Sequence, residues 1–428
     1  MNLASSNLAS SSAQLASGQA LSWFQQLARA KLLERLNSLH DGVLRYSERQ
    51  FVAQHQDDDA QPIEFGAPSR DSLTAQLRVD DARFFSQLAV GGSIGFAESY
   101  MRGHWHTDNL TDLLRMLYRN RLQASAKPSL PGLAVQLARR IAFKLQSNTI
   151  GRSRRHIAAH YDLSNDFFEL FLDSTWMYSS AYFENDSLSL AEASEAKLAQ
   201  ICRKLDPQPQ EHVLEIGTGW GGFALHLLQH HDVRLTTTTI SESQRTKAVE
   251  RVNARGLANR VELLNVDYRQ LHGQFDKLVS IEMIEAVGEQ FLPTYFRQCD
   301  RLLRPGGRMV MQAIVMPEQR YTAYRKNVDF IQQYIFPGGF LPSISALQDA
   351  VGAGTDFRLI ELEDLSLHYA RTLAEWRKRF VGNLAAVRQL GFDDRFIRMW
   401  EYYLCYCEAG FREQAVRLVQ IVWDKPMH

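Results

Sequence analysis

The sequence predicts an α/β protein in which a parallel sheet is covered by helices on both faces, preceded by a small mixed domain. Three observations support this. From about residue 156 onward, helical stretches alternate with short β-rich runs, among them HVLEIG, RLTTTTI, VELLNV, KLVSIEM and RMVMQAIV, a pattern typical of parallel sheets. A glycine-rich turn follows the first of these runs. The chain of 428 residues is also longer than one core usually spans, which favours two domains.

The N-terminal part divides into a tail and a small domain. Residues 1–20 are rich in Ser and Ala and carry no charge, so we expect a flexible tail; a signal peptide would have a basic start. Residues 21–120 begin with the helical pattern WFQQLARAKLLERLNSL and continue with short strands around LRYSERQFVAQ and QPIEFG. GFAESYMRGHW then precedes a further helix. A small α+β domain is therefore predicted over 21–120.

A basic linker is predicted over 121–155, before a large domain over 156–428. Between Arg115 and Arg155 there are ten Lys or Arg residues and no acid. Within it, LAVQLARRIAFKLQ spaces apolar residues at helical intervals. Two interpretations are equally good: a segment facing anionic lipid headgroups, or a solvated helix between domains. RNA binding lacks the interleaved aromatic residues it would need.

Composition limits the remaining possibilities. The net charge is zero, so attraction to a membrane or nucleic acid requires local asymmetry. The four cysteines show no paired CxxC spacing, which argues against a zinc site or a disulfide framework and favours a reducing cytosol. No uncharged apolar run of about 18 residues occurs, so we expect a cytoplasmic protein with at most peripheral contact at the inner face of the membrane.

The turn after the first strand, in VLEIGTGWGGFALHLL, contains Gly217, Gly219, Gly221 and Gly222. Such a turn lets a ligand approach the backbone at the carboxyl edge of a sheet. Nicotinamide, flavin and adenosylmethionine enzymes all use GxG turns, but Glu215 before the first glycine and the GxGxGG spacing favour S-adenosylmethionine.

Seven blocks in order make the interpretation specific: AHYDLSNDFFELFLDSTWMYSSAYF, LEIGTGWGG, TISESQ, SIEMIEAVG, IFPGGFLPS, HYARTLAEW and LCYCEAGFR. With these the chain resembles the cyclopropane fatty acid synthase and mycolic acid methyltransferase family, in its longer form acting on bacterial phospholipids. The resemblance implies a class I methyltransferase fold with a seven-stranded sheet. It also implies a homodimer and an unsaturated phospholipid as substrate, with no nucleic acid partner.

The resemblance further implies which residues bind S-adenosylmethionine. Tyr178 and Ser179 would contact it, and the turn from Leu214 to Gly222, with Glu215, would surround its methionine part. For the ribose and adenine, the expected residues are Thr239, Gln244 (or Glu242), Asp267 and Tyr268.

The reaction implied by the resemblance adds the S-adenosylmethionine methyl to an acyl-chain double bond through a carbocation, which calls for aromatic faces. The expected acyl pocket includes aromatic residues after RMVMQAIV: Tyr321, Tyr324, Phe330, Tyr334, Phe336 and Phe340.

In the family a bicarbonate is held by Cys, Glu, His and Tyr, and it removes the proton. Glu285 and Tyr369 keep two of these residues, whereas Ser180 stands for the Cys and Gln312 for the His. Gln312 cannot carry a positive charge beside an anion, which argues against bicarbonate. Cys407 matches a cysteine treated as an active-site residue of the family; small core packing is its alternative.

Glu282 is the chain's own variation, because the family often has Gly there and His at the position of Ala286. We hypothesise that its carboxylate replaces bicarbonate as the proton acceptor; the alternative is that it points out of the site into an ion pair. A changed base can change the product from a cyclopropane to a methyl-branched or methylene chain. Two other functions stay open: a lipid-binding protein that has lost catalysis, and a methyltransferase for small molecules.

Overall fold

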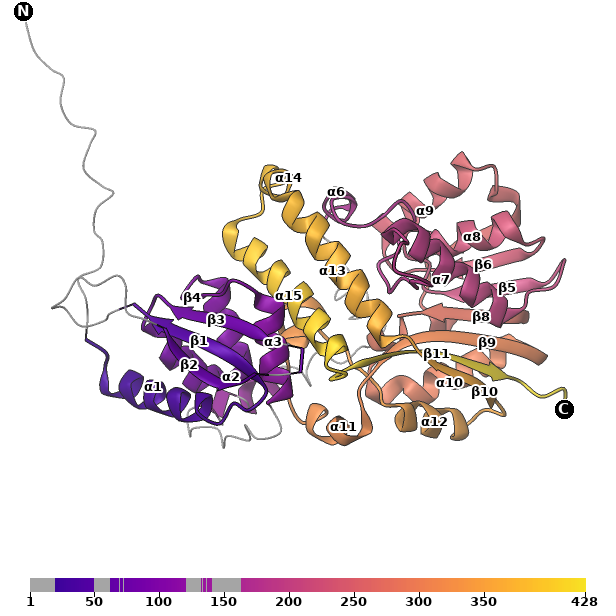
Figure 1. The fold of residues 1–428 in the computed structure, drawn as a ribbon. Helices are drawn as coiled ribbons and strands as arrows, with labels where there is room; N and C mark the ends of the chain where they lie inside the picture. The colour runs from indigo at the N-terminus through magenta and orange to yellow at the C-terminus, as the bar shows by residue number, and fades with distance from the viewer. Residues whose placement is uncertain are drawn as a thin grey trace, which may run out of the picture.

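The computed structural model describes residues 20–49, 62–68, 70–71, 73–120, 132, 134–135, 137–140 and 163–428. They form two sheets, and two long helices, α13 and α15, stand between them (Figure 1). Residues 1–19 of the tail predicted over 1–20 lie outside the described residues, and so does most of the predicted linker, including 8 of the 14 residues of LAVQLARRIAFKLQ.

The N-terminal domain joins a four-stranded sheet of order β2-β1-β3-β4 to three helices. Its elements are α1 (Trp23–Leu36), β1 (Gly42–Glu48), β2 (Ile63–Ala67), β3 (Thr74–Val79), α2 (Arg83–Met101), β4 (Trp105–His106) and α3 (Leu110–Arg119). Ser22 caps α1 in a reciprocal capping box with Gln25, and Asn109 caps α3. A kink at Gly92, with φ of 57°, interrupts α2. Helices and strands are thus mixed in this part of the chain.

The large domain contains the seven-stranded sheet expected from the sequence, with order β10-β11-β9-β8-β5-β6-β7. The strands are β5 (His212–Ile216), β6 (Arg234–Thr238), β7 (Val261–Leu264), β8 (Phe275–Ile281), β9 (Leu303–Val315), β10 (Arg358–Asp364) and β11 (Arg417–Asp424). The first five pair in parallel.

The predicted parallel part of the sheet extends from β5 to β9, whereas β11 runs antiparallel to both β9 and β10. The pattern of the sequence did not predict β10, an edge strand in which Leu359, Ile360 and Leu362 are exposed. An edge strand without a buried face lacks the alternation that identifies a strand.

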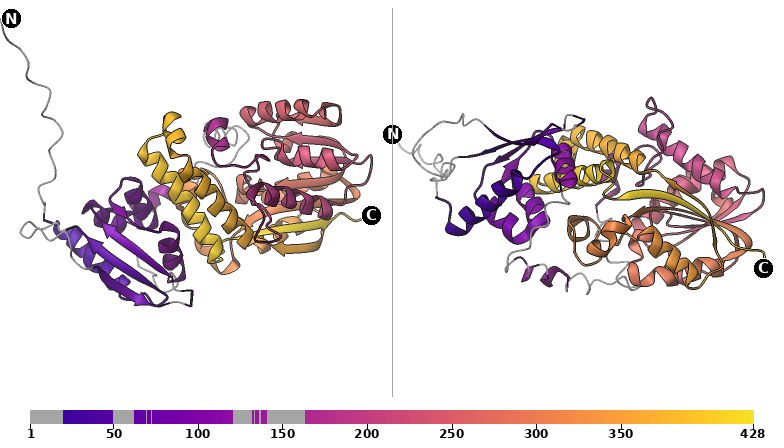
Figure 2. Two further views of the ribbon diagram at one scale, coloured as in Figure 1. Left: turned by 45° about the horizontal axis from the view of Figure 1, so that its top comes forward. Right: turned by 60° about the horizontal axis from the view of Figure 1, so that its bottom comes forward.

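Helices cover both faces of this sheet, as predicted (Figure 2). One face carries α7 (Leu190–Leu205), α8 (Gly222–His230) and α9 (Glu242–Ala254), and the other carries α10 (Leu292–Leu302) and α12 (Ile344–Gly352). The other helices are α6 (Asn165–Glu169), α11 (Glu318–Tyr324), α13 (Ser366–Gly382), α14 (Leu384–Gln389) and α15 (Asp394–Arg412). Short 3-10 turns occupy 258–260, 268–270, 284–286 and 289–291, and a π-turn occupies 331–335. No described helix is long and apolar enough to cross a membrane.

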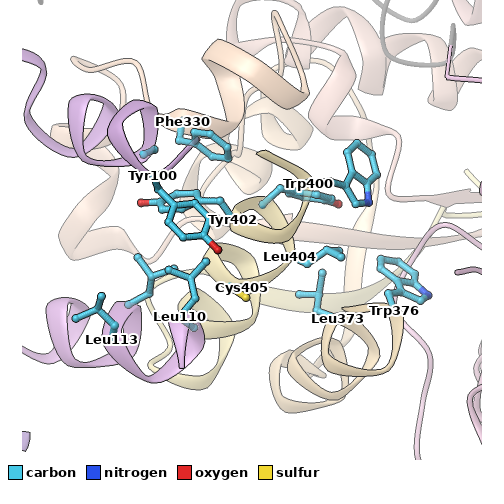
Figure 3. Close-up of a cluster of buried hydrophobic side chains, with 14 of the residues drawn as sticks. Tyr100, Leu110, Leu113, Phe330, Leu373, Trp376, Trp400, Tyr402, Leu404 and Cys405 are labelled. Carbon is cyan, nitrogen blue, oxygen red and sulfur yellow. The ribbon is translucent and has the colours of Figure 1, made fainter. Parts of the chain in front are cut away.

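One hydrophobic core joins the two domains across α15. Tyr100 from α2 and Leu110 and Leu113 from α3 belong to the same buried cluster as Tyr402 and Leu404 from α15 (Figure 3). Polar contacts reinforce the junction: Glu413, after α15, accepts hydrogen bonds from Arg115 at 2.7 Å and Arg119 at 2.8 Å. These two bases of the predicted basic segment therefore join the domains.

Candidate active site

A cavity of about 1270 Å³ connects the carboxyl edge of the large sheet with the N-terminal domain. At one end it is lined by the glycine turn, in the middle by Glu282 and Glu285, and at the other end by leucines of α1, α2 and α3. Those leucines are Leu32, Leu36, Leu88, Leu113, Leu114 and Leu117. Both domains therefore contribute to one continuous site.

The glycine turn suits close approach of a ligand. Gly217 and Gly219 line the cavity with φ of 107° and 52°, which favour glycine. A Cβ at Gly219 would meet no atom within 4 Å, so open space lies beside this backbone. Gly221 and Gly222 lie outside the lining. Gly221, with φ of 82°, forms the turn that begins α8. A side chain at Gly222 would collide with Met177, so glycine is needed there for close packing.

Glu215, at the end of β5, is buried beside the turn and lines the cavity. The Thr237 hydroxyl donates a 2.6 Å hydrogen bond to its Oε2. Burial raises the pKa of Glu215 to about 8. The residue is therefore a protonated acid at neutral pH, able both to donate and to accept a hydrogen bond.

The other predicted cofactor residues also line the cavity, namely Tyr178, Ser179, Thr239, Gln244, Asp267 and Tyr268. Gln244 is buried, and its Oε1 accepts a 3.1 Å bond from Thr239. Glu242, the alternative, is largely exposed and forms an ion pair with Arg245. The geometry favours Gln244.

Asp267 is held by its neighbour in the 3-10 turn. Both carboxylate oxygens of Asp267 accept 2.7 Å bonds from Arg269. The carboxylate is thus fixed before any ligand arrives.

Glu282 occupies a strained backbone position directly after β8. Its φ of 49° is unusual for a residue other than glycine and costs on the order of 1 kcal/mol. The strain turns its side chain into the cavity, so the alternative of an outward ion pair is wrong. Backbone strain of this kind often accompanies function.

Three donors converge on the Glu282 carboxylate. The Ser180 N–H and the Gln312 amide donate to Oε1 at 2.9 and 2.7 Å. The Tyr369 hydroxyl donates to Oε2 at 2.8 Å. Burial raises the pKa of Glu282, and the three hydrogen bonds oppose that rise. Three of the four residues that the family resemblance assigns to a bound bicarbonate therefore hold a carboxylate of the chain itself.

Glu285 lies in the next turn and has a different environment. Its Oε1 accepts a 2.6 Å bond from the Ile314 N–H, while its Oε2 is buried without a hydrogen-bond partner in the described part of the chain. Burial, together with the charge of Glu282, raises the pKa of Glu285 to about 8. Because Glu282 accepts three hydrogen bonds and Glu285 fewer, the negative charge of the pair resides on Glu282 and the proton on Glu285.

Cys407, on α15, lines the cavity and is only partly buried. Its low-polarity surroundings raise the pKa of the thiol. A neutral thiol is a weak nucleophile, so Cys407 contributes to the cavity wall.

The expected aromatic pocket is only partly composed of the predicted residues. Tyr324, Phe336 and Phe340 line the cavity. Phe330 instead packs on Tyr402, with ring centroids 4.8 Å apart, and Tyr334 donates a 2.6 Å bond to Glu98 of α2. Tyr321 packs against Phe340 and stays outside the lining.

Sequence reasoning missed the aromatic face of α15. Tyr402, Tyr403 and Tyr406 line the cavity, and the Tyr403 hydroxyl lies 2.9 Å from that of Tyr178. Their spacing of three and four residues in YYLCY predicts one helical face. The sequence alone did not show that this face meets the cavity. Lys197, buried in α7, was missed as well.

Comparison with known proteins shows to which family the chain belongs. The sequence matches the family described as Mycolic acid cyclopropane synthetase over residues 149–421. The chain belongs to this family. It is accordingly an S-adenosylmethionine-dependent methyltransferase acting on fatty acyl chains, as the seven ordered blocks indicated, and the predicted family, fold class and cofactor are confirmed.

Two relatives and one solved structure define the similarity. The chain is 42% identical over 333 residues to the tuberculostearic acid methyltransferase UfaA1 of Mycobacterium tuberculosis, covering 75% of this chain and 76% of the relative. It is 36% identical over 360 residues to the cyclopropane-fatty-acyl-phospholipid synthase of Escherichia coli K12, covering 83% and 89%. A mycolic acid cyclopropane synthase, solved with SAH and CTAB, superposes with a TM-score of 0.60 at 31% identity, covering 64% of this chain and 98% of that one.

The described residues contain no group of three or more His, Cys, Asp or Glu side chains arranged to hold a metal ion.

Proposed function

We propose that this protein methylates the double bond of an unsaturated acyl chain of membrane phospholipid through a carbocation, with the Glu282 carboxylate as proton acceptor. The observation that carries this proposal is the convergence of Ser180, Gln312 and Tyr369 on Glu282 inside the cavity. A carboxylate at this position can accept a proton from an acyl chain that lies in the cavity beside the glycine turn.

The glycine turn and its surroundings suit S-adenosylmethionine, which supplies an electrophilic methyl group bound to sulfur. Gly217 and Gly219 leave their backbone accessible. Glu215 and Gln244 offer hydrogen-bonding groups in the cavity wall. We assign Tyr178, Ser179, Asp267 and Tyr268 to the same binding site because they line the same cavity as the glycine turn.

In the first step the π electrons of the alkene form a bond to the methyl carbon, and the electron pair of the S–CH₃ bond remains on sulfur. The adjacent chain carbon becomes a cation. Tyr178, Phe336 and Tyr403 form an aromatic cluster in the cavity wall, with ring centroids 6.4 Å apart for Tyr178 and Phe336 and 6.2 Å for Phe336 and Tyr403. Their π faces stabilise a nearby cation.

In the second step Glu282 accepts a proton. If the proton leaves the added methyl, its C–H electron pair closes a cyclopropane ring. If it leaves the neighbouring chain carbon, the pair forms a new double bond and the product is a methyl-branched olefin. A methylene chain forms if a hydride first moves from the methylated carbon to the cation and the methyl group then loses the proton. Burial and the charge of Glu282 raise the pKa of Glu285, which favours Glu282 over Glu285 as the base.

Formation of a methyl-branched or methylene chain is a second candidate function. The 42% identical relative is named a methyltransferase, whereas the 36% identical one is named a cyclopropane synthase. The carboxylate of Glu282 is attached to the protein, so its position relative to the cation decides which proton it reaches.

The far end of the cavity supports a phospholipid substrate. Apolar residues of α1, α2 and α3 line it, among them Leu32 and Leu88. Arg35 and Arg140, both exposed, also belong to the lining. Guanidinium groups beside an apolar channel suit a lipid phosphate next to its acyl chains.

The test is to incubate the protein with methyl-labelled S-adenosylmethionine and vesicles of unsaturated phospholipid, followed by mass spectrometry of the acyl chains. We expect each modified chain to gain one carbon, with the double bond lost for a cyclopropane and retained for a branched olefin. Vesicles of saturated phospholipid are the control. A protein that binds lipid without catalysis would transfer no label, and activity independent of vesicles would indicate a small-molecule substrate.

The role of Glu282 has its own test. Glu282→Gln keeps the size of the side chain but removes its basicity, so turnover is expected to fall by at least about 1000-fold while SAH binding stays within a few-fold. Glu361→Gln, on the exposed strand β10, is the matched control and should keep normal turnover. Near-normal turnover of Glu282→Gln contradicts the assignment.

A further inference from the structure

Lys197 is a buried cation that the reaction described above does not use. It lies in α7, and its side chain is 0% exposed. Its Nζ donates a 2.9 Å hydrogen bond to the Ser179 hydroxyl. An ammonium group has three protons to donate, and a buried charge is costly unless compensated. The buried ammonium group of Lys197 therefore needs negative charge nearby to compensate it.

The surroundings of Lys197 supply negative charge from several elements. Glu282 after β8 has the largest electrostatic effect on it, followed by Asp173, Glu215 on β5 and Glu195 on α7. Glu215 is protonated at neutral pH, because burial raises its pKa to about 8. That leaves Glu282 as the main counter-charge inside the site.

The two remaining acids have closer partners. Asp173 accepts hydrogen bonds from the Thr175 N–H at 3.0 Å and the Ser194 hydroxyl at 3.1 Å. Glu195, half exposed, pairs with His226 at 2.6 Å. Neither depends on Lys197 for compensation.

Geometry links Lys197 to Glu282 through two consecutive residues. Lys197 fixes the side chain of Ser179. The next peptide N–H, that of Ser180, donates the 2.9 Å bond to Glu282 Oε1. A shift of the segment 179–180 would therefore alter both the predicted cofactor contact and one of the three donors to Glu282.

We propose that Lys197 is a positioning residue whose charge keeps Glu282 a carboxylate and whose hydrogen bond fixes the segment 179–180. This inference rests on the proposed role of Glu282 as the proton acceptor. The other charged or titratable groups that act on Glu282 or respond to it are Glu285, Tyr369 on α13 and Tyr403 on α15.

The ionisation of Lys197 agrees with this role. Burial lowers the pKa of Lys197 to about 8, and the charge of Glu282 opposes that fall. The ammonium therefore remains positive at neutral pH. Its charge favours the ionised form of Glu282.

The test is Lys197→Met, which keeps the linear side chain and removes the charge. The turnover of the wild type should rise with pH as Glu282 loses its proton. In the variant we expect this limb of the pH profile to move to higher pH by about one pH unit. At a pH on the acid side of this limb, turnover should fall by roughly 10-fold, with SAH binding changed only a few-fold.

Two variants separate charge from packing. Lys204→Met, on the same helix, removes a lysine that pairs with Glu361 and Glu363 outside the cavity, and it should leave the pH limb in place. Ser179→Ala removes the hydrogen bond but not the charge, so we expect weaker SAH binding and a smaller movement of the limb than in Lys197→Met. An unmoved limb in Lys197→Met, with the variant folded, overturns the proposal.

A measurement on the wild type keeps the proposal testable if Lys197→Met does not fold. The infrared difference between the wild type and Glu282→Gln at pH 7 reports the protonation of Glu282 directly. We expect a carboxylate band, and a protonated-acid band from Glu282 overturns the inference. If Glu282→Gln stays active, the proposed function fails; if it is inactive but the limb does not move, only the role of Lys197 fails.

Discussion

Gln420 lies directly opposite Gln312 in the antiparallel pair of β11 and β9, and its side-chain amide donates a 2.9 Å hydrogen bond to the Gln312 Oε1. Both residues are buried. Because the carbonyl of Gln312 is engaged by Gln420, its NH₂ group faces Glu282. A residue remote from the reacting atoms thus fixes which end of an amide meets the proposed base.

Gln420→Leu should release this constraint. The Gln312 amide could then rotate and present its oxygen to the Glu282 carboxylate, which is repulsive. We expect turnover to fall by roughly 10-fold, the worth of about one hydrogen bond to a charged group, with SAH binding unchanged. Steady-state kinetics and calorimetry measure the two effects. Equal losses in both would indicate a general packing defect.

The stability of the protein should decline as pH rises through neutrality because of Glu285. Its pKa is raised from 4.5 to about 8, so the folded state binds the proton more tightly than the unfolded chain does. This contribution is fully present below about pH 4.5 and is lost as pH rises toward 8. Glu285→Gln removes the titration, so the difference in unfolding free energy between variant and wild type should shift in favour of the variant by about 4 kcal/mol between pH 5 and pH 9. Urea unfolding at both pH values measures it, and a constant difference contradicts the prediction.

Glu282→Gly should create an inactive enzyme that responds to added anions. Glycine accepts the φ of 49° at this position without strain. The removal of the side chain leaves the donors of Ser180, Gln312 and Tyr369 facing the space that the carboxylate filled. We expect added bicarbonate to restore turnover by at least about 10-fold in a saturable way.

Glu282→Gln is the matched control for this experiment, since its amide still fills the same space and bicarbonate should have no effect. Absence of rescue in Glu282→Gly would show that the three donors do not form an anion site by themselves.

Glu413→Gln should weaken the junction between the domains. Its carboxylate binds both Arg115 and Arg119, and all three side chains are less than one-fifth exposed. Removal of one partner from a partly buried ion cluster costs about 1–3 kcal/mol of unfolding free energy. Glu64→Gln, whose ion pair with Arg45 is 59% exposed on both sides, should cost under about 0.5 kcal/mol. Urea unfolding compares the two, and equal costs would exclude a special role of the junction.

The sequence by itself determined the family, the fold class and the cofactor, and it named a part of the cavity lining. Strand alternation and the turn around Gly217 and Gly219 are local patterns, since periodicity and turn chemistry depend on neighbouring residues. For the same reason the exposed edge strand β10, which has no buried face, gave no usable pattern.

Only the tertiary structure decided the roles of the two acids in SIEMIEAVG. The strained φ of Glu282 turns it into the cavity, and its donors come from positions 180, 312 and 369, which are far apart in the chain. Lys197, buried 85 residues before Glu282, shows no local signal at all. Hydrogen-bond partners and buried charges are set by how distant segments pack, and that packing determines where the negative charge resides.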